Sequence, residues 1–278
     1  MKHHQSVVSR LLSYLVLGVL AVLFLIPFYL LLRNALMTDP QITSTRWSWL
    51  PIPPVWSNFH KLFTDPAAPM ATGLINSGII AVTTLVFQML FSSMAGYALA
   101  RIPARGRNVV FGLIVSTLMI PAAVTFVPTY AVTAFLGGIN TRWGIIVPGL
   151  FSAFSIFLFR QFYLGFPVEI EEAGRLDGLG YAGIYWRLLL PNSRSILMAL
   201  GVLAFISSWN AFLWPLVIGQ DPSSWTVQVV LSTFLTAQTL NLSELFAAAL
   251  VGIAPLVIVF LLMQRSIVEG AKFSGGKG

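Results

Sequence analysis

The stretch LLSYLVLGVLAVLFLIPFYLLL, residues 11–32, is an apolar run that contains no charged side chain. A helix needs about 20 predominantly apolar residues to cross the hydrocarbon core of a bilayer. The run is longer than the apolar region of a usual signal peptide and has no obvious small-residue cleavage site. We therefore interpret it as an uncleaved transmembrane helix.

The rest of the chain has the same character. It is 57% hydrophobic and 9% charged, with a mean hydropathy of +0.84, which is well above the range of soluble domains. Further candidate spans lie at about 74–100, 109–131, 143–164, 196–218 and 245–264. The sequence thus predicts an all-α, polytopic membrane protein with six transmembrane helices in a single domain, residues 1–278.

Residues 222–243 also lack charge, but they carry several polar side chains: Gln228, Ser232, Thr233, Thr236, Gln238 and Asn241. Such groups are costly when they face lipid. We expect this segment to be a connector outside the membrane or facing a cavity, and not a seventh span.

The distribution of Lys and Arg favours the same count. With six spans and a cytoplasmic N-terminus, twelve basic residues lie inside, and four lie outside, namely Arg33, Arg46, Lys61 and Arg142. A seventh span would move Arg265, Lys272 and Lys277 outward and weaken this bias. We predict a multi-pass protein of the cell (plasma) membrane with both termini in the cytoplasm.

Two other features of the apolar segments are less specific. Prolines lie in or at the edges of the spans and are expected to kink them, either as static bundle geometry or to shape a cavity. They are Pro27, Pro121, Pro128, Pro148, Pro215 and Pro255. In the connector 33–72, Trp47, Trp49 and Trp56 predict an interfacial aromatic belt.

Several kinds of chemistry are excluded or disfavoured. The chain has no cysteine, and its three histidines, His3, His4 and His60, lie in the tail or a connector, so we predict no metal site. The net charge of +7 comes from basic residues at the edges of apolar segments, where topology places them, and does not indicate nucleic acid. We found no phosphate-binding glycine loop and no nucleophile motif, so we predict no catalytic residue.

The longest internal segment, 165–195, is rich in charged residues for so apolar a chain. Its core, EEAGRLDGLGYAGIYWRLLLP (171–191), predicts a short helix after Pro167, a sharp turn at Gly178 and Gly180, and a second helix ending at Pro191. This shape suggests a cytoplasmic element that docks into a partner. Acid–base chemistry by Glu171, Glu172 and Asp177 is the alternative, but no other convergent group supports it.

The segment resembles the cytoplasmic EAA loop of ABC-importer permeases, whose pattern is E-A-A, three residues, G, nine residues and I-x-L-P. Glu172-Ala173-Gly174 is followed at the same spacing by Gly178 and by Leu188-Leu189-Leu190-Pro191. The departures are Gly174 for alanine and Leu188 for isoleucine. Gly174 is expected to loosen the first helix at a cost of about 1 kcal/mol relative to alanine.

The wider chain resembles the smaller permease of maltose-type carbohydrate importers. The matching stretches are 76–101, 118–130, 140–148, 157–178 and 208–216, with the ending EGAKFSGGKG the least faithful. The resemblance implies a second homologous permease, two ATPase subunits that hold ATP and Mg, and an extracytoplasmic solute-binding protein. It implies that this chain itself is not an enzyme and that segment 219–243 reaches towards the binding protein.

By the same resemblance, the segment 165–195 couples transport to ATP hydrolysis. The residues assigned to coupling are Glu171, Glu172, Ala173, Gly174, Arg175, Asp177, Gly178, Leu188, Leu190 and Pro191. The cargo implied is a carbohydrate or a carbohydrate-like solute. A glycerophospho-compound carried by the same machinery is an alternative, and a stand-alone carrier or channel, or a membrane enzyme, is a weaker one.

Polar residues within the spans are candidates for the substrate pathway, because they are costly unless they face a cavity or a partner. They are Asn76, Gln88, Trp209 and Asn210, with Trp209 able to stack on a sugar face. The alternative for each residue is an interhelical hydrogen bond or packing at the permease–permease interface.

Overall fold

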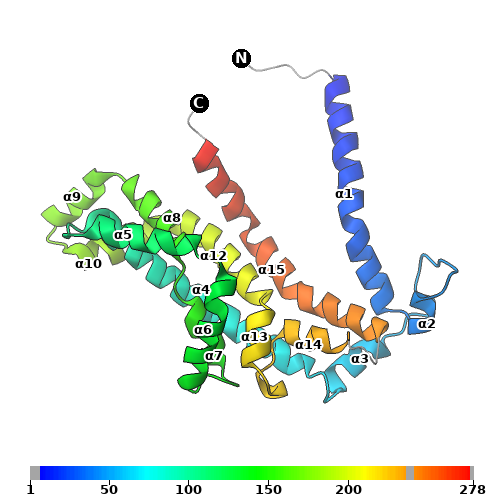
Figure 1. Ribbon diagram of the computed structural model, residues 1–278. Coiled ribbons are helices and arrows are strands. Elements are labelled where there is room, and N and C mark those ends of the chain that lie inside the picture. Colours follow the sequence, from blue (N-terminus) through cyan, green and yellow to red (C-terminus); the bar gives the residue numbers. More distant parts are fainter. Residues whose placement is uncertain (1–6, 236–240, 276–278) are drawn as a thin grey trace. The chain divides into compact units, whose positions relative to one another are not determined.

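The computed structural model describes residues 7–235 and 241–275, with side chains over 10–235 and 241–264. The histidines at 3 and 4, the residues Thr236 and Gln238, and the last residues of the tail lie outside the described residues. The elements in the described part are helical (Figure 1). In chain order they are α1 (Val7–Ala35), α2 (Asp39–Ile42), α3 (Ser57–Thr64), α4 (Met70–Arg101), α5 (Arg107–Ser116), η1 (Thr117–Met119), α6 (Ala122–Phe135), α7 (Arg142–Ile146), η2 (Val147–Gly149), α8 (Ala153–Leu164), α9 (Val168–Leu176), α10 (Tyr181–Ile184), η3 (Tyr185–Leu189), α11 (Leu190–Asn192), α12 (Arg194–Trp209), α13 (Leu213–Ile218), η4 (Pro222–Ser224), α14 (Val227–Thr233) and α15 (Leu242–Gly275).

Three helices are each long and apolar enough to cross a membrane. They are the span Arg10–Ala35 of α1, the whole of α4, and the part Leu242–Gln264 of α15. The apolar side chains of α1 from Leu11 to Ile26 are exposed, so they can contact lipid or another chain. The N-terminal apolar stretch therefore forms a helix whose apolar side chains are exposed within the first unit.

Three further candidate spans are pairs of helices with a sharp bend between them, which raises the count to as many as six. The bends are 103° between 107–119 and 122–135, 43° between 142–149 and 153–164, and 76° between 181–192 and 194–209. Length and composition thus allow six spans, in agreement with the fold class expected from the sequence.

The helix expected over 109–131 is interrupted at Pro121. Ile120, just before it, has an extended backbone with ψ of 116°, because the proline ring disfavours helical geometry in the preceding residue. The helix expected over 196–218 also breaks: α12 ends at Trp209 and α13 begins at Leu213. Apolar composition located these segments but did not reveal the breaks within them.

The chain forms two compact units. The first contains residues 1–70 and 231–253, and the second contains 71–230 and 254–278. In the first unit, the buried Asn58 amide donates to the carbonyls of Ala35 and Met37, at 2.9 Å each. The Arg33 guanidinium lies 4.1 Å from the centre of the Trp47 ring. Trp47, Trp49 and Trp56 are exposed, as side chains of an interfacial belt would be.

The second unit is built around a core of aromatic and aliphatic side chains from α4, α8, α10, η3 and α12. Its buried members include Tyr97, Phe159, Tyr163, Tyr185 and Leu189. Helices α4 and α8 approach closely at Gly96, where a Cβ atom would lie 2.6 Å from that of Phe159. This core joins two membrane helices directly to the segment that follows α8.

The polar connector after α13 folds back on α4 within the second unit. Val227, Val229 and Val230 are buried, and the Val227 N–H donates to the Ser77 hydroxyl at 2.8 Å. A Cβ atom on Gly73 would lie 2.9 Å from the Val230 side chain. Glycine at 73 therefore permits the close approach of this connector to the start of α4.

Candidate functional site

The charged segment forms helix α9, a turn, and the continuous run of α10 and η3. Figure 1 shows α9 and α10 together at one end of the second unit, and α9 also contacts η3. Val168 follows Pro167, and Glu169 and Glu171 lie in the first turn, where carboxylates favour the helix N-terminus. The expected helix–turn–helix is therefore present in this part of the chain.

Helix α9 ends in a Schellman motif centred on Gly178. The Leu179 N–H donates to the Gly174 carbonyl at 2.9 Å, and the Gly178 N–H donates to the Arg175 carbonyl at 3.0 Å. Gly178 has a φ of +80°, the left-handed region that side-chain-bearing residues seldom adopt. Apart from Gly178 and its immediate chain neighbours, none of the described residues has an atom within 4 Å of where a Cβ on Gly178 would stand. The requirement for glycine within this chain is therefore one of backbone conformation.

The second helical run widens into a π-helical turn, η3, just before Pro191. The Leu190 N–H donates to the Tyr185 carbonyl, five residues back. Proline has no N–H and its ring clashes with the carbonyl four residues earlier, so the regular α-helical pattern cannot continue through Pro191. The proline that ends the sequence pattern thus coincides with a change in helix geometry.

A buried ion pair ties α9 to the end of α4. Only 3% of Glu171 is exposed, and its Oε1 lies 3.0 Å from Nε of Arg101. The Nε–H itself donates to the Tyr163 carbonyl at 2.8 Å. The Glu171 Oε1 atom therefore interacts with Arg101 through an ion pair and accepts no hydrogen bond from Nε. Another guanidinium N–H donates to the Phe166 carbonyl. Arg101 therefore joins the ends of α4 and α8 to the first turn of α9.

This burial distinguishes two adjacent acids that sequence reasoning grouped together. Glu171 faces the interior of this chain, whereas Glu172 is exposed. Ala173, Arg175 and Asp177 are exposed as well, with the Arg175 guanidinium 5.4 Å from the centre of the Tyr181 ring. Sequence reasoning did not single out Arg101, because its position at a helix end was fully explained by the positive-inside rule.

Leu176 is the most exposed large apolar side chain of this segment, at 90%. Sequence reasoning passed over it, although it lies between the two charged residues Arg175 and Asp177. Gly174, two residues earlier, is buried, so Leu176 stands on the outward-facing side of α9. Leu176 is thus the most exposed of the apolar side chains of α9, and charged residues precede and follow it in the chain.

The two departures from the family pattern lie in contact. A Cβ atom on Gly174 would stand 2.6 Å from Cδ1 of Leu188, which is closer than non-bonded carbon atoms approach one another. Leu188 is half-buried against this glycine, and Leu190, two residues on, is also half-buried, whereas Pro191 is exposed. The glycine at 174, which is smaller than the alanine of the family pattern, therefore makes room for leucine in place of isoleucine at 188.

We expect the exchanges Gly174→Ala and Leu188→Ile to be non-additive. Alone, Gly174→Ala gains about 1 kcal/mol in helix propensity but forces the Leu188 side chain to move. With isoleucine at 188, that conflict is relieved, so the double variant should be more stable than the sum of the single variants by roughly 0.5–3 kcal/mol. Thermal unfolding of the purified variants measures this coupling, and strict additivity would contradict the contact.

Asn76, one of the predicted pathway residues, is fully buried and its amide is saturated by this chain. Its Nδ2 donates to the carbonyls of Ser223 and Trp225 at 2.9 Å each, and its Oδ1 accepts from Nε of Arg142 at 2.9 Å. These bonds favour the alternative interpretation, a structural hydrogen bond between segments. The role of Asn76 in the pathway stays a prediction.

Trp209 and Asn210 differ in exposure although they are adjacent. Trp209 is 3% exposed and stacks on Phe205 with ring centres 5.7 Å apart, so its ring is engaged inside this chain. Asn210 is exposed, and its Oδ1 accepts from Nε2 of Gln228 at 3.3 Å. Of the two, Asn210 remains accessible to a solute, and the pathway role of both stays a prediction.

Gln88 lines a cleft of about 620 Å³ within the second unit. Residues from α4, α6, the turn 147–152, α12 and α13 form its walls. Gln88 and Ser152 also line an adjoining hollow of about 200 Å³, which extends along α12. Clefts of several hundred Å³ are typical of small-molecule sites.

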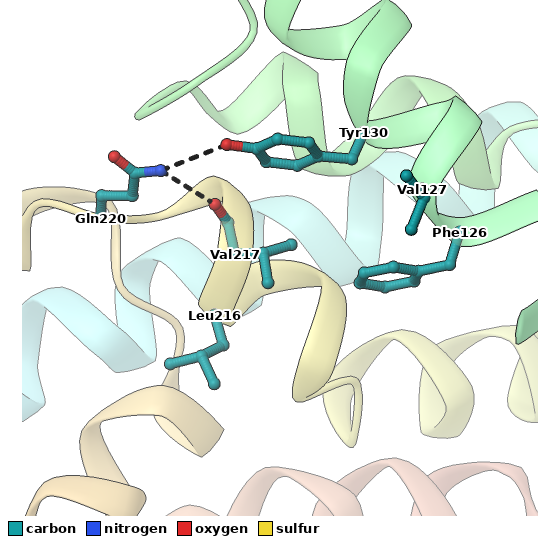
Figure 2. A pocket seen from close by; sticks show the side chains of 6 residues that line it. All are labelled: Phe126, Val127, Tyr130, Leu216, Val217 and Gln220. Carbon is teal, nitrogen blue, oxygen red and sulfur yellow. Dashed lines mark hydrogen bonds between the residues drawn. The ribbon is translucent and has the colours of Figure 1, made fainter.

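A smaller hollow of about 350 Å³ lies between α6 and α13 and shares Phe126 with the cleft (Figure 2). Figure 2 shows the Gln220 amide directed towards Tyr130 and Val217, with Nε2 3.5 Å from the Tyr130 hydroxyl and 3.4 Å from the Val217 carbonyl. Beside it, bonds from the hydroxyl and the N–H of Ser223 lower the pKa of Asp221 below its ordinary value. The hollow therefore opens next to a polar, hydrogen-bonded loop.

Within residues 10–235 and 241–264, no cluster of three or more His, Cys, Asp or Glu side chains is placed to hold a metal ion. The site chemistry visible in this chain consists instead of an exposed helix–turn–helix and a neutral cleft. Both features belong to the second unit.

Residues 88–272 match the family described as "Binding-protein-dependent transport system inner membrane component". The arabinooligosaccharide transport permease AraQ of Halalkalibacterium halodurans is 37% identical over 80% of this chain and 79% of its own length. The sn-glycerol-3-phosphate transport permease UgpE of Yersinia enterocolitica is 34% identical over 92% of both chains. A bacterial ABC transporter involved in import of the acidic polysaccharide alginate has the same fold, with a TM-score of 0.83, 23% identity, and coverage of 95% of this chain and 99% of that one.

Proposed function

This chain belongs to the family of binding-protein-dependent transport system inner membrane components, and we propose that it couples solute import to ATP hydrolysis through the segment 165–195. One observation carries the proposal: α9 presents exposed groups outward while its inner face is joined to α4. The proposed partners are two ATPase subunits, which hold ATP and Mg and carry out the hydrolysis. The chain itself takes no catalytic step.

The inner attachments of α9 suit it to transmit force. The Arg101–Glu171 pair fixes its first turn, and the core residues Ile184 and Leu189 fix the helix that follows the Gly178 turn. Movement of α9 by an ATPase would therefore carry the ends of α4 and α8 with it. Rocking of these helices is how alternating access would follow from ATP binding.

The other proposed partners account for surfaces that this chain leaves uncovered. A second homologous permease would complete the pathway, and an extracytoplasmic binding protein would deliver the cargo, with the connector after α13 reaching towards it. The exposed apolar side chains of α1 fit lipid or the second permease. In this arrangement both termini and the segment 165–195 lie in the cytoplasm.

The cargo proposed is a carbohydrate or a carbohydrate-like solute, supported by the similarity to AraQ. A glycerophospho-compound is the second candidate, because UgpE is similar to this chain at nearly the same identity as AraQ. Transport by this chain alone in proteoliposomes would instead indicate a stand-alone carrier or channel.

We expect Leu176→Asp to abolish association with the ATPase subunits. The substitution puts a charge where an apolar side chain would be buried on docking, and a buried unpaired carboxylate is strongly unfavourable. Co-purification of the ATPase with tagged permease should fall at least about tenfold, which corresponds to about 1.4 kcal/mol.

Leu50→Asp provides the matched control, because Leu50 is 62% exposed in a connector outside this segment. That variant should retain normal co-purification. Undiminished association of Leu176→Asp would refute docking through α9, provided that both variants reach the membrane in equal amounts.

A further inference from the structure

The cleft in the second unit is lined mainly by hydroxyl, amide and aromatic groups. Its polar side chains include Thr84, Gln88, Thr125, Ser152, Ser207 and Ser208. They come from α4, α6, α12 and the N-cap of α8, so separate segments direct neutral polar groups into one space. Convergence of this kind is typical of a binding site and not of helix packing alone.

Some of these groups have hydrogen-bonding capacity left. Over residues 10–235 and 241–264, the Gln88 amide and the Ser207 hydroxyl make no hydrogen bond within the chain. The Ser152 oxygen accepts from the Ser155 N–H at 3.2 Å, which leaves its own hydrogen to be donated. Gln88, Ser152 and Ser207 also line the adjoining hollow, so these free groups follow one path along α12.

Aromatic rings form another part of the wall. Trp214 and Phe126 meet edge to face, with ring centres 5.5 Å apart, and the Trp214 Nε1–H donates to the Gly144 carbonyl at 3.2 Å. Phe151, a third lining ring, stacks on Phe91. Rings held in this way can pack against the C–H face of a sugar, which is the role that sequence reasoning gave to the now buried Trp209.

No residue that lines the cleft is charged. Two helix N-termini, at Ala122 and Ser152, face it, but each offers only about half a unit of positive charge. Protein sites for phosphate usually add Arg or Lys. The nearby Arg142 is bonded to Asn76 and is not among the lining residues. An anion in this cleft would therefore lose much of its hydration without gaining a full opposite charge.

We propose that this cleft is where the subunit contacts its cargo, and that the cargo is an uncharged polyhydroxylated molecule of the saccharide class. The inference rests on the proposed import function and selects between its two candidate cargoes. Gln88, Ser152 and Ser207 donate and accept hydrogen bonds to the hydroxyls of the cargo, and Trp214 and Phe126 pack against its apolar face.

The test uses the complete transporter, with its own binding protein, reconstituted in proteoliposomes. Two radiolabelled probes are compared in ATP-dependent uptake: an arabinooligosaccharide and sn-glycerol 3-phosphate. The variants Gln88→Ala and Ser207→Ala should each reduce uptake of the saccharide at least about tenfold, with subunit assembly unchanged. Ser207→Thr keeps the hydroxyl and should retain uptake.

Ser116→Ala is the control, because it removes an exposed hydroxyl from α5 that bonds only within its own helix. Uptake of sn-glycerol 3-phosphate in preference to the saccharide would overturn the inference, as would full saccharide uptake by both alanine variants. If the unmodified complex took up neither probe in the presence of ATP, that result would instead count against the proposed function.

Discussion

Arg101→Met should uncouple ATP hydrolysis from transport and destabilise the permease. The methionine keeps the apolar stem of the side chain but leaves Glu171 buried without a partner, a change that typically costs about 3–5 kcal/mol. It also removes the donors to the carbonyls of Tyr163 and Phe166. In the purified complex, transport-stimulated ATP hydrolysis should fall at least about tenfold, together with the melting temperature.

Further variants separate stability from coupling. Arg101→Met with Glu171→Gln removes the orphan charge, so the melting temperature should largely recover while stimulated hydrolysis stays low. The charge swap, Arg101→Glu with Glu171→Arg, should not restore stimulated hydrolysis, because the carbonyls at the end of α8 lose their hydrogen-bond donor. Normal stimulated hydrolysis in the double neutral variant would refute a positioning role for the pair.

Gly178→Asp should insert and fold but lose coupled ATP hydrolysis. Aspartate tolerates the left-handed conformation better than most residues, so the turn at φ +80° can be retained. Its carboxylate would stand next to Asp177 in space that this chain leaves open and that a docked partner would occupy. Stimulated hydrolysis should fall at least about tenfold, an effect of about 1.4 kcal/mol or more.

The matched variants are Gly178→Asn and Gly178→Val. Asparagine has nearly the same shape without the charge and should retain more activity than aspartate. Valine, which is β-branched, should disrupt the Schellman turn itself and lower thermal stability as well. Full stimulated hydrolysis in the aspartate variant would refute docking at this turn.

Much of the structure of the segment 165–195 could be predicted because its determinants are local. Proline before the first helix, glycine at its C′ position and proline at the end of the second each act on neighbouring backbone groups, and they lie at the spacing observed. The partner of Glu171 was not predictable in this way. Arg101 lies 70 positions earlier, and only the packing of α4 against α8 brings it within 3.0 Å.

The candidate pathway shows the same division. Polar residues in apolar segments were visible in the sequence, but their environment was not. Asn76 is saturated by Ser223, Trp225 and Arg142, whereas Gln88 faces a cleft with free hydrogen-bonding capacity. Both carry a side-chain amide on α4, so composition alone does not distinguish them.

The sequence by itself determined that the chain is an all-helical membrane protein with a charged helix–turn–helix at 165–195, because hydropathy, charge bias and turn residues act over short distances. The tertiary structure decided where the spans break, which acid is buried, and which polar groups share a cleft. These properties depend on contacts between residues far apart in the chain, such as Arg101 with Glu171 and Gly174 with Leu188, whose free energies arise only when the helices pack.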